Sequence, residues 1–327
     1  MNFKTKIKAQ ASKLKFAFGK SPIIDSIENY ADYIPKPYKT VVIISADFEL
    51  AWAWQWSKQK DALDLAIQKS KNTRVNFPKL MELCERYNIP ITWATVGHLF
   101  LESCSSHKNL AQLANFENDY WRYDKPDWFM NDPCSNYKDA PYWYAPDLIK
   151  QIIESPVEHE IGCHTFSHID CRDSVCSPEV FNSEINACKK EAENLNLQLK
   201  SFVHPAHTIG NLDNLAKLGF TNFRTNNRNV LTYPKKHSNG LWEFEQTAEF
   251  VYRKEWSIDY HIYRYKKIID RAIKSNTVCY FWFHPSFDAE MVNNILPEVF
   301  KYLDSKRDEA LIISSGNYID YLNENDR

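Results

Sequence analysis

The segment His159-Glu160-Ile161-Gly162-Cys163-His164-Thr165-Phe166-Ser167-His168 is the part of this 327-residue chain from which the fold can best be deduced. Its two last histidines stand four positions apart, so both imidazoles can reach one ion across a helical turn or a tight loop. Gly162 is expected to let the backbone turn closely at the end of a short apolar strand. A histidine pair alone is weak evidence for a metal site. Two other segments, 45–49 and 281–285, carry residues that can complete one.

The composition excludes several classes of protein. Hydrophobic residues make up 44% of the chain and aromatic residues 14%, which suits a sizeable core. The formal net charge of −2 argues against nucleic acid as the main partner, because nucleic-acid binding usually requires a basic face. The 7 glycines form neither a phosphate-binding loop nor a dinucleotide fingerprint. The 8 cysteines include no Cys-x-x-Cys pair and predict reduced thiols.

The N-terminal region is basic. Residues 2–20 contain six lysines and no acid, and Phe3, Ile7, Leu14 and Phe18 fall on one face at helical spacing. Two interpretations remain open: a helix that lies on an anionic membrane, or a solvated helix packed on the edge of the domain. No run of about 18 apolar residues and no secretory signal are present, so we expect a cytoplasmic protein, peripheral at the inner face of the membrane if this helix binds lipid.

Strands and helices alternate through the rest of the chain. The run Thr-Val-Val-Ile-Ile-Ser over 40–45 predicts a buried strand, because it is continuous and β-branched. With a helix over 72–88 and a strand over 90–96, it favours a parallel sheet with crossover helices. The alternation gives about seven β/α units, with further strands over 159–163, 201–204, 222–225, 277–284 and 310–314 and helices over 178–196, 211–218, 259–275 and 317–323.

Two regions lack this alternation of strands and helices, and they define the predicted domain organisation. Residues 1–38 form a basic helical extension that ends near Pro35-Lys36-Pro37, and the main domain spans 39–327. Within the main domain, residues 105–145 are rich in Asp, Asn, Pro and aromatic side chains. We predict a long ordered insertion there, since loops of this length are usually functional.

Asp47 and Glu49 come at the end of the first predicted strand. Their spacing of two places both carboxylates on one face, where they repel each other unless a cation lies beside them. A Zn²⁺ ion bound by His164 and His168 can be that cation. One carboxylate and two histidines leave coordination positions on the zinc open for water and substrate. The other carboxylate is then free to accept a proton from water. The alternative is that both acids are ordinary residues at a strand end.

His284 follows the apolar strand Tyr280-Phe281-Trp282-Phe283. It is expected at the carboxyl rim of an α/β barrel, where active sites gather, and could act there as a general acid. The alternative is a structural histidine at the rim.

Together these motifs resemble the polysaccharide deacetylase family, the NodB-type carbohydrate esterases. The resemblance runs in family order from about residue 40 to 320 and rests on Asp47-x-Glu49, the segment 159–168, Phe202-Val203-His204-Pro205 and Phe283-His284-Pro285. It implies an irregular (β/α)7 barrel and a divalent metal, usually zinc. It also implies hydrolysis of an N-acetyl, or occasionally another N-acyl, group on an amino sugar.

The resemblance also implies roles for individual residues. Asp47 matches the base and His284 the acid, whereas Glu49, His164 and His168 match the metal ligands. Many relatives have two adjacent aspartates in the first motif, so the Asp-x-Glu form leaves open which carboxylate binds the metal.

The third motif departs from the family pattern. Relatives usually carry an arginine beside its proline that orients the catalytic aspartate, but 203–207 reads Val-His-Pro-Ala-His. His204, His207 or Arg224 could take this supporting role, or catalysis could be weakened.

These observations predict a metal-dependent N-deacetylase that acts on a cytoplasmic nucleotide- or lipid-linked amino sugar. Trp52 and Trp54, with Trp56 and the aromatics of the insertion, either stack on sugar rings or fill a core. Two other functions remain: hydrolysis of a non-sugar amide such as a ureide ring, and carbohydrate binding without turnover. The sequence does not predict the oligomeric state.

Overall fold

The computed structural model describes residues 3–56, 61–105 and 128–325. Within these residues, ten strands form one curled sheet, all of whose neighbours are parallel except β8 and β9. In pairing order the strands are β10 (Ala248–Glu249), β11 (Val278–Phe283), β2 (Thr40–Phe48), β3 (Thr92–Thr95), β4 (Glu160–Cys163), β5 (Ser201–Val203), β6 (Asn222–Thr225), β9 (Trp242–Glu245) and β8 (Lys235–Lys236), while β12 (Ala310–Ile312) pairs with the start of β2. The predicted irregular barrel of β/α units is confirmed.

One continuous segment, 242–249, links the two ends of this sheet. Its first half is β9, which pairs with β6, and its second half is β10, which pairs with β11. The change of partner comes at two adjacent residues: the N–H of Gln246 donates to Thr225 O at 3.1 Å, and that of Thr247 donates to Tyr280 O at 2.7 Å. The sequence prediction missed this segment.

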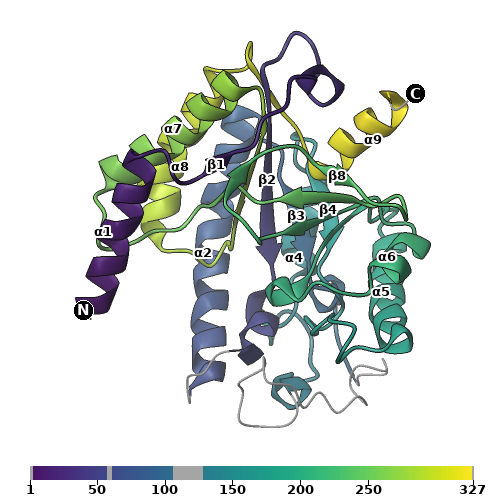
Figure 1. Ribbon diagram of the computed structural model, residues 1–327. Helices are drawn as coiled ribbons and strands as arrows, with labels where there is room; N and C mark the ends of the chain where they lie inside the picture. Colours follow the sequence, from purple (N-terminus) through teal and green to yellow (C-terminus); the bar gives the residue numbers. More distant parts are fainter. Residues whose placement is uncertain (1–2, 57–60, 106–127, 326–327) are drawn as a thin grey trace.

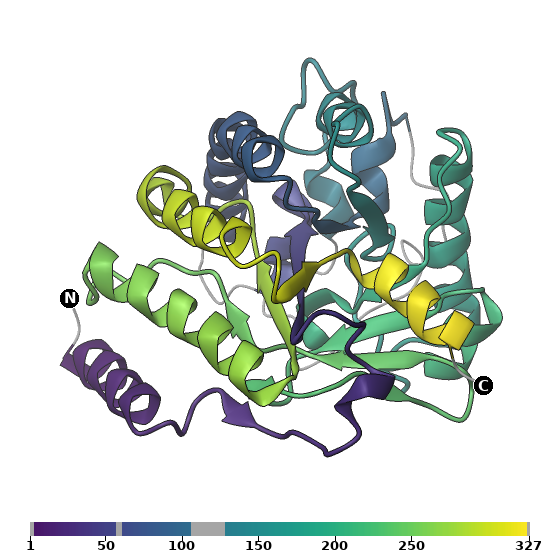
Figure 2. The ribbon, with the colours of Figure 1, turned by 90° about the horizontal axis from the view of Figure 1, so that it is seen from above.

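Helices cover the outside of the sheet (Figures 1 and 2). The predicted helices lie close to their expected ranges, although the one predicted over 72–88 begins at residue 62, because Ala62 and Ala66 continue its buried face. The helix over 296–304 was not predicted. The bounds of the helices are α2 (Ala62–Tyr87), α4 (Pro146–Ile153), α5 (Pro178–Glu193), α6 (Leu212–Lys217), α7 (Ile258–Ser275), α8 (Leu296–Asp304) and α9 (Ser315–Asn325). Short helical segments are η1 (Tyr30–Asp32), η2 (Leu50–Trp56), η3 (Gly97–Phe100), η4 (Trp128–Asn131), η5 (Pro205–His207) and the π-helix η6 (Met291–Ile295).

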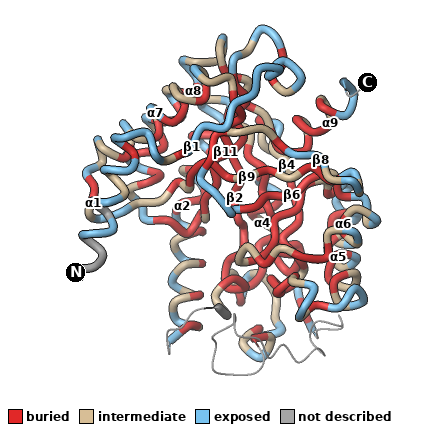
Figure 3. Tube along the Cα trace, in the orientation of Figure 1, coloured by how far each residue is buried: buried red, intermediate tan, exposed pale blue. Residues whose placement is uncertain are grey.

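Strand β2 carries the candidate site residues into the barrel. All nine of its residues are buried, as a continuous β-branched run predicts for a strand covered on both faces (Figure 3). Val41 and Ile43 pack in a cluster with side chains of β9 and β11, whereas the residues between them pack in the larger core with the helices. The same alternation turns Ser45 and Asp47 toward the inside of the barrel.

The N-terminal helix α1 (Phe3–Ala17) lies beside α7 in both views (Figures 1 and 2). Its buried anchor is Phe16, whose ring lies under the guanidinium of Arg271 at 4.4 Å. The predicted apolar face points the other way: Ile7, Leu14 and Phe18 are 52%, 51% and 74% exposed. Among the described residues, no helix combines the length and apolar character needed to cross a bilayer.

Two peripheral features complete the fold. Strand β1 (Ile23–Ile24) pairs with β7 (Val230–Leu231) in a separate parallel ribbon. The described part of the predicted insertion, 128–145, is joined to the chain before it by an antiparallel bridge between Ser103 and Asn136. The predicted aromatics Tyr120, Trp121 and Tyr123 lie outside the described residues.

Candidate active site

Asp47 and Glu49 lie where β2 leaves the sheet. Asp47 is 4% exposed and Glu49 7% exposed, so both carboxyl groups are removed from bulk water. Leu50 follows with φ 48°, which turns the chain away into η2. Because β2 is parallel to its neighbours, the loops after β4 and β11 emerge at the same edge of the barrel.

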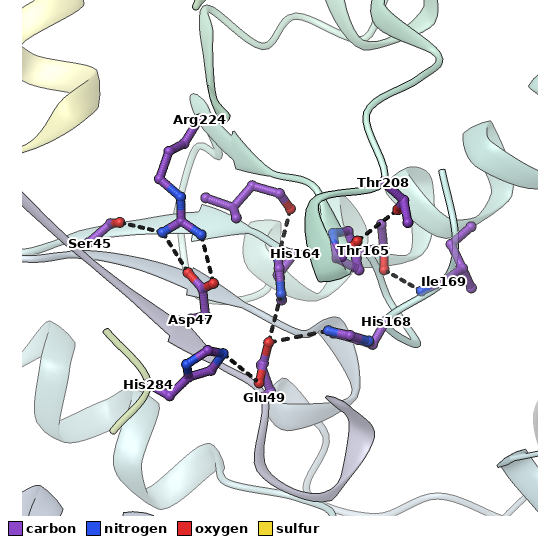
Figure 4. Close-up of polar contacts among 12 residues, drawn as sticks. Ser45, Asp47, Glu49, His164, Thr165, His168, Ile169, Thr208, Arg224 and His284 are labelled. Atoms are coloured by element: carbon purple, nitrogen blue, oxygen red, sulfur yellow. Dashed lines mark hydrogen bonds and ion pairs between the residues drawn. The ribbon is translucent and has the colours of Figure 1, made fainter. Parts of the chain in front are cut away.

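His164 and His168 occupy the loop after β4. They do not lie on a helix: Thr165 and His168 both have φ 57°, and this left-handed backbone folds the loop back on itself. Both imidazoles are buried and converge on one oxygen, with His164 Nε2 3.0 Å and His168 Nε2 3.2 Å from Glu49 Oε1 (Figure 4). Gly162 lies inside β4, where a Cβ would come within 2.8 Å of Ser201 O, so this glycine serves strand packing and not the predicted turn.

The tautomer of His164 indicates what this group can bind. Its Nδ1 lies 2.7 Å from the carbonyl oxygen of Val203, and a carbonyl can only accept, so Nδ1 carries the proton. In the neutral ring, Nε2 then presents a lone pair to a carboxylate oxygen. Two acceptors at 3.0 Å repel unless a cation or a proton lies between them, and a histidine fixed through its other nitrogen is typical of metal ligands. Glu49, His164 and His168 therefore fit a divalent metal.

Asp47 is held by Arg224, which comes from β6. Arg224 Nη1 and Nη2 donate to the two carboxylate oxygens of Asp47 at 2.8 and 2.7 Å, and Nη1 also donates to Ser45 Oγ at 2.8 Å (Figure 4). The guanidinium is buried and lies over the ring of Trp282, 4.6 Å from its centroid. Burial raises the pKa of Asp47, but the charge of Arg224 outweighs it and holds that pKa below its usual range.

His204 and His207, the other two residues considered as partners of Asp47, make different contacts. His204 Nε2 donates to Gly210 O at 3.0 Å, and burial lowers the pKa of His204 to about 3. The ring of His207 packs edge-on against Trp282, and burial lowers its pKa to about 4. Of the three candidates for the supporting role, Arg224 is the one that donates to both oxygens of Asp47.

His284 lies beside Glu49, on the solvent-exposed side of the group formed by Glu49, His164 and His168. Its Nε2 is 3.6 Å from Glu49 Oε2, and its side chain is 31% exposed, more than the other four candidate residues. Burial lowers the pKa of His284, but the carboxylate of Glu49 and then that of Glu249 outweigh this effect and raise it to about 9. Glu249 Oε1 lies 3.8 Å from His284 Nδ1, and this neighbour was missed because the strand that carries it was missed.

The structure favours the second interpretation of Trp52, that it fills a core. Its side chain is fully buried, its Nε1 donates to Trp143 O at 3.0 Å, and its ring stacks on His98 at 3.9 Å. Trp54 is partly buried against the core, with Lys69 Nζ 5.8 Å from its ring centroid, and its contact with substrate stays a prediction. The side chain of Trp56 lies outside the described residues. Among the described insertion aromatics, Trp128, Trp143 and Tyr144 are buried as well, whereas Phe129 and Tyr142 are partly buried.

The chain was compared with known proteins. A family model described as polysaccharide deacetylase matches residues 65–222, which include His164 and His168. A putative polysaccharide deacetylase from Mycobacterium smegmatis superposes with a TM-score of 0.61 at 11% identity, over 90% of this chain and 93% of that one. A probable polysaccharide deacetylase from Pseudomonas aeruginosa PAO1 gives 0.57 at 10% identity, over 90% and 94%. The PuuE allantoinase gives 0.57 at 10% identity, over 90% and 93%.

None of the curated proteins compared matches this sequence. Likeness to solved structures at such low identity shows the fold alone. The predicted resemblance to the polysaccharide deacetylase family is confirmed by the family model over residues 65–222.

Proposed function

We propose that this protein is a metal-dependent hydrolase that removes an N-acetyl, or another N-acyl, group from an amino sugar. The observation that carries the proposal is the convergence of three metal-type ligands, Glu49, His164 and His168, between a carboxylate fixed by an arginine and a partly exposed histidine. Such a site has separate groups for holding a metal, accepting a proton and donating a proton.

Glu49, His164 and His168 would hold the metal. A carboxylate oxygen and two imidazole nitrogens suit zinc, and three protein ligands leave positions for water and substrate. When bound, the ion supplies polarisation of the acyl carbonyl and activation of water. Among the ligands, Glu49 is favoured over Asp47 because both oxygens of Asp47 already accept from Arg224.

Asp47 acts as the base that accepts a proton from the attacking water. Its buried carboxylate stays ionised because Arg224 is paired with it, and the two parallel hydrogen bonds fix the plane of the carboxylate. Arg224 is thus a positioning residue. It stands in for the arginine that relatives carry in the third motif.

His284 donates a proton to the departing nitrogen. Its position at the open side of the group lets it reach a bound substrate, and Glu249 on its other nitrogen orients the ring. Without a proton donor the leaving group would depart as an unstable amide anion, so this step is needed for any amide substrate.

The carrier of the sugar is a further part of the proposal. A nucleotide- or lipid-linked amino sugar in the cytoplasm suits the eight cysteines, which are all free thiols. The exposed apolar residues of α1, flanked by lysines, suit contact with an anionic membrane and hence a lipid-linked substrate.

A second candidate, hydrolysis of a ureide ring, is supported by the fold likeness to an allantoinase. Both reactions break a C–N bond with the same set of groups. Carbohydrate binding without turnover is disfavoured, because the missing arginine on which that idea depended has a replacement in Arg224.

The test is a substrate panel assayed with the zinc-loaded chain. It contains free N-acetyl hexosamines, their nucleotide- and lipid-linked forms, and allantoin. We expect acetate release from at least one N-acetyl sugar and no ring opening of allantoin. Ring opening without acetate release would favour the ureide reaction, and metal binding without any hydrolysis would favour a binding protein.

A further inference from the structure

A second group of metal-type ligands lies next to the histidine loop, the segment 164–168 that carries His164 and His168. His98 in η3, Cys104 shortly after it and Asp132 after η4 each bring one ligand atom within 4.8 Å of the others. All three side chains are buried: His98 is 1%, Asp132 7% and Cys104 8% exposed. None of them belongs to the group formed by Glu49, His164 and His168.

Cys134, an exposed cysteine beside this group, is a candidate for a fourth ligand. The thiol of Cys134 contacts that of Cys104, and the N–H of Cys134 donates to Asp132 Oδ1 at 3.1 Å. The two cysteines lie on adjacent antiparallel segments, because Cys104 N donates to Ser135 O at 2.8 Å and Ser103 bridges to Asn136. One thiol, an imidazole and a carboxylate thus converge from two segments of the chain, and the second thiol, that of Cys134, lies beside them.

This donor set is typical of zinc. Zinc in structural sites takes four ligands, mostly thiolate and imidazole, whereas magnesium and calcium prefer oxygen ligands. Zinc bonds of about 2.0–2.3 Å place tetrahedral ligand atoms about 3.3–3.8 Å apart. His98, Cys104 and Asp132, whose ligand atoms lie within 4.8 Å of one another, therefore need to close by at most about 1.0–1.5 Å, and Cys134 needs to turn toward them.

Hydrogen bonds that orient His98 and Asp132 also support a zinc site. His98 Nδ1 donates to the carbonyl oxygen of Phe166 at 2.7 Å, so in the neutral ring Nε2 carries the lone pair that a metal needs. Asp132 Oδ1 also accepts a hydrogen bond from the hydroxyl of Tyr144, which fixes the carboxylate. Histidines and carboxylates that are oriented by such neighbours are characteristic of metal sites.

We infer that His98, Cys104, Asp132 and Cys134 form a second, structural zinc site, separate from the candidate active site. With four protein ligands it has no open position for substrate, so its role is to join the insertion to η3.

The zinc site would also support the active site. His98 contacts the histidine loop twice through Phe166 O, by its Nδ1 and by its backbone N–H at 3.1 Å, and Gly97 N donates to Thr165 O at 2.9 Å. A metal that fixes His98 therefore fixes the loop that carries His164 and His168. The site is coupled to the proposed function by this contact but does not depend on it.

The test uses the full chain loaded with Co²⁺. Thiolate ligands give Co²⁺ an intense sulfur-to-metal charge-transfer band, and the group of Glu49, His164 and His168 contains no sulfur. We expect two ions per chain and a charge-transfer band. Cys104→Ser should lose the band and one ion, whereas Glu49→Gln should lose the other ion and keep the band.

Cys84→Ser is the matched control, because Cys84 is a buried cysteine of α2 that belongs to neither group. It should keep both ions and the band. The charge-transfer band is measured first on the wild-type protein, so the inference can be tested even if a variant does not fold. The absence of a charge-transfer band in the wild type would overturn the inference, as would a Cys104–Cys134 disulfide that forms even when zinc is present during purification.

Discussion

Arg224 in β6 and Asp47 in β2 face each other across the inside of the barrel, joined by two hydrogen bonds of 2.8 and 2.7 Å. The pair is almost completely buried, with side-chain exposures of 1% and 4%. Such a pair needs both members, because removing one leaves the other as an unpaired buried charge. The arrangement therefore links the orientation of the proposed base to the stability of the barrel.

Arg224→Met should lower the free energy of unfolding by about 3–5 kcal/mol, because Asp47 is left charged and buried. The double variant Asp47→Asn/Arg224→Met should lose clearly less stability than Arg224→Met alone. Urea unfolding of the wild type, both single variants and the double variant measures this coupling. Additive losses would show that the two residues do not stabilise each other.

Glu49→Gln should weaken metal binding at the candidate active site by more than about 100-fold, because a neutral amide replaces the charged ligand shared by the two histidines. Metal content after dialysis against a weak chelator measures the loss. His159→Gln is the matched control: it changes a histidine of the same segment whose Nδ1 accepts from Ile91 N, and it should keep its metal. Equal retention in both variants would remove Glu49 from the ligand set.

Gly97→Ala should destabilise the protein by about 1–3 kcal/mol and loosen the histidine loop. A Cβ at Gly97 would lie 2.3 Å from the Phe166 ring, 2.8 Å from Cys188 Sγ and 2.9 Å from Phe166 Cα. Metal affinity should fall together with stability. Gly219→Ala is the comparison, because Gly219 has φ +87° with nothing within 4 Å: it should cost stability through backbone strain and leave metal affinity unchanged.

Glu184 predicts a pH dependence of stability. Its buried carboxylate accepts from Ser167 N and Ser167 Oγ, and burial raises its pKa to about 7 from the ordinary 4.5. Between pH 4.5 and 7 the folded state therefore holds a proton that the unfolded state has lost. The contribution of Glu184 to the free energy of unfolding thus falls as pH rises through this range, by roughly 3 kcal/mol at most.

Glu184→Gln should remove this pH dependence, because a glutamine can accept from Ser167 N and donate to Ser167 Oγ at any pH. The measurement is the difference in unfolding free energy between wild type and variant at pH 5 and pH 8. The variant should gain relative to the wild type at the higher pH. A difference that stays constant would mean that the carboxyl group does not titrate in this range.

The exposed apolar face of α1, which Phe18 continues directly after the helix, predicts binding to anionic vesicles. Leu14→Ser and Phe18→Ser should each weaken binding about tenfold or more, since burying one such side chain contributes about 1.5–3 kcal/mol. Vesicle flotation measures the partitioning. Val75→Ser is the control, because Val75 is 76% exposed on α2. Unchanged partitioning of the α1 variants would leave the helix as a solvated element packed on α7.

The sequence predicted the residues that end strands better than it predicted their partners. Asp47, Glu49 and His284 follow apolar runs, and parallel strands bring such ends to one edge, so their meeting could be anticipated. The partner of Asp47 could not, because Arg224 is 177 residues away and its direction depends on the register of β6. Three candidates therefore remained until the structure placed Arg224 beside the carboxylate.

Other features were hidden for physical reasons as well. The segment 242–249 changes its pairing partner halfway, so no single strand pattern marks it. Trp52 is covered by His98 and Trp143, which are distant in sequence. The ligands His98, Cys104 and Asp132 lie on short or irregular segments, where no periodic spacing brings them together before the chain has folded.

The central claim is that Asp47 transfers a proton while Glu49, His164 and His168 hold a metal. It is tested most directly by measuring metal content and acetate release on the same zinc-loaded samples of wild type and Asp47→Asn, with an N-acetyl amino sugar that the wild type hydrolyses. The account predicts equal metal content, and turnover in Asp47→Asn reduced by at least about 100-fold. Turnover in Asp47→Asn close to that of the wild type, or loss of the metal together with the carboxylate, would contradict it.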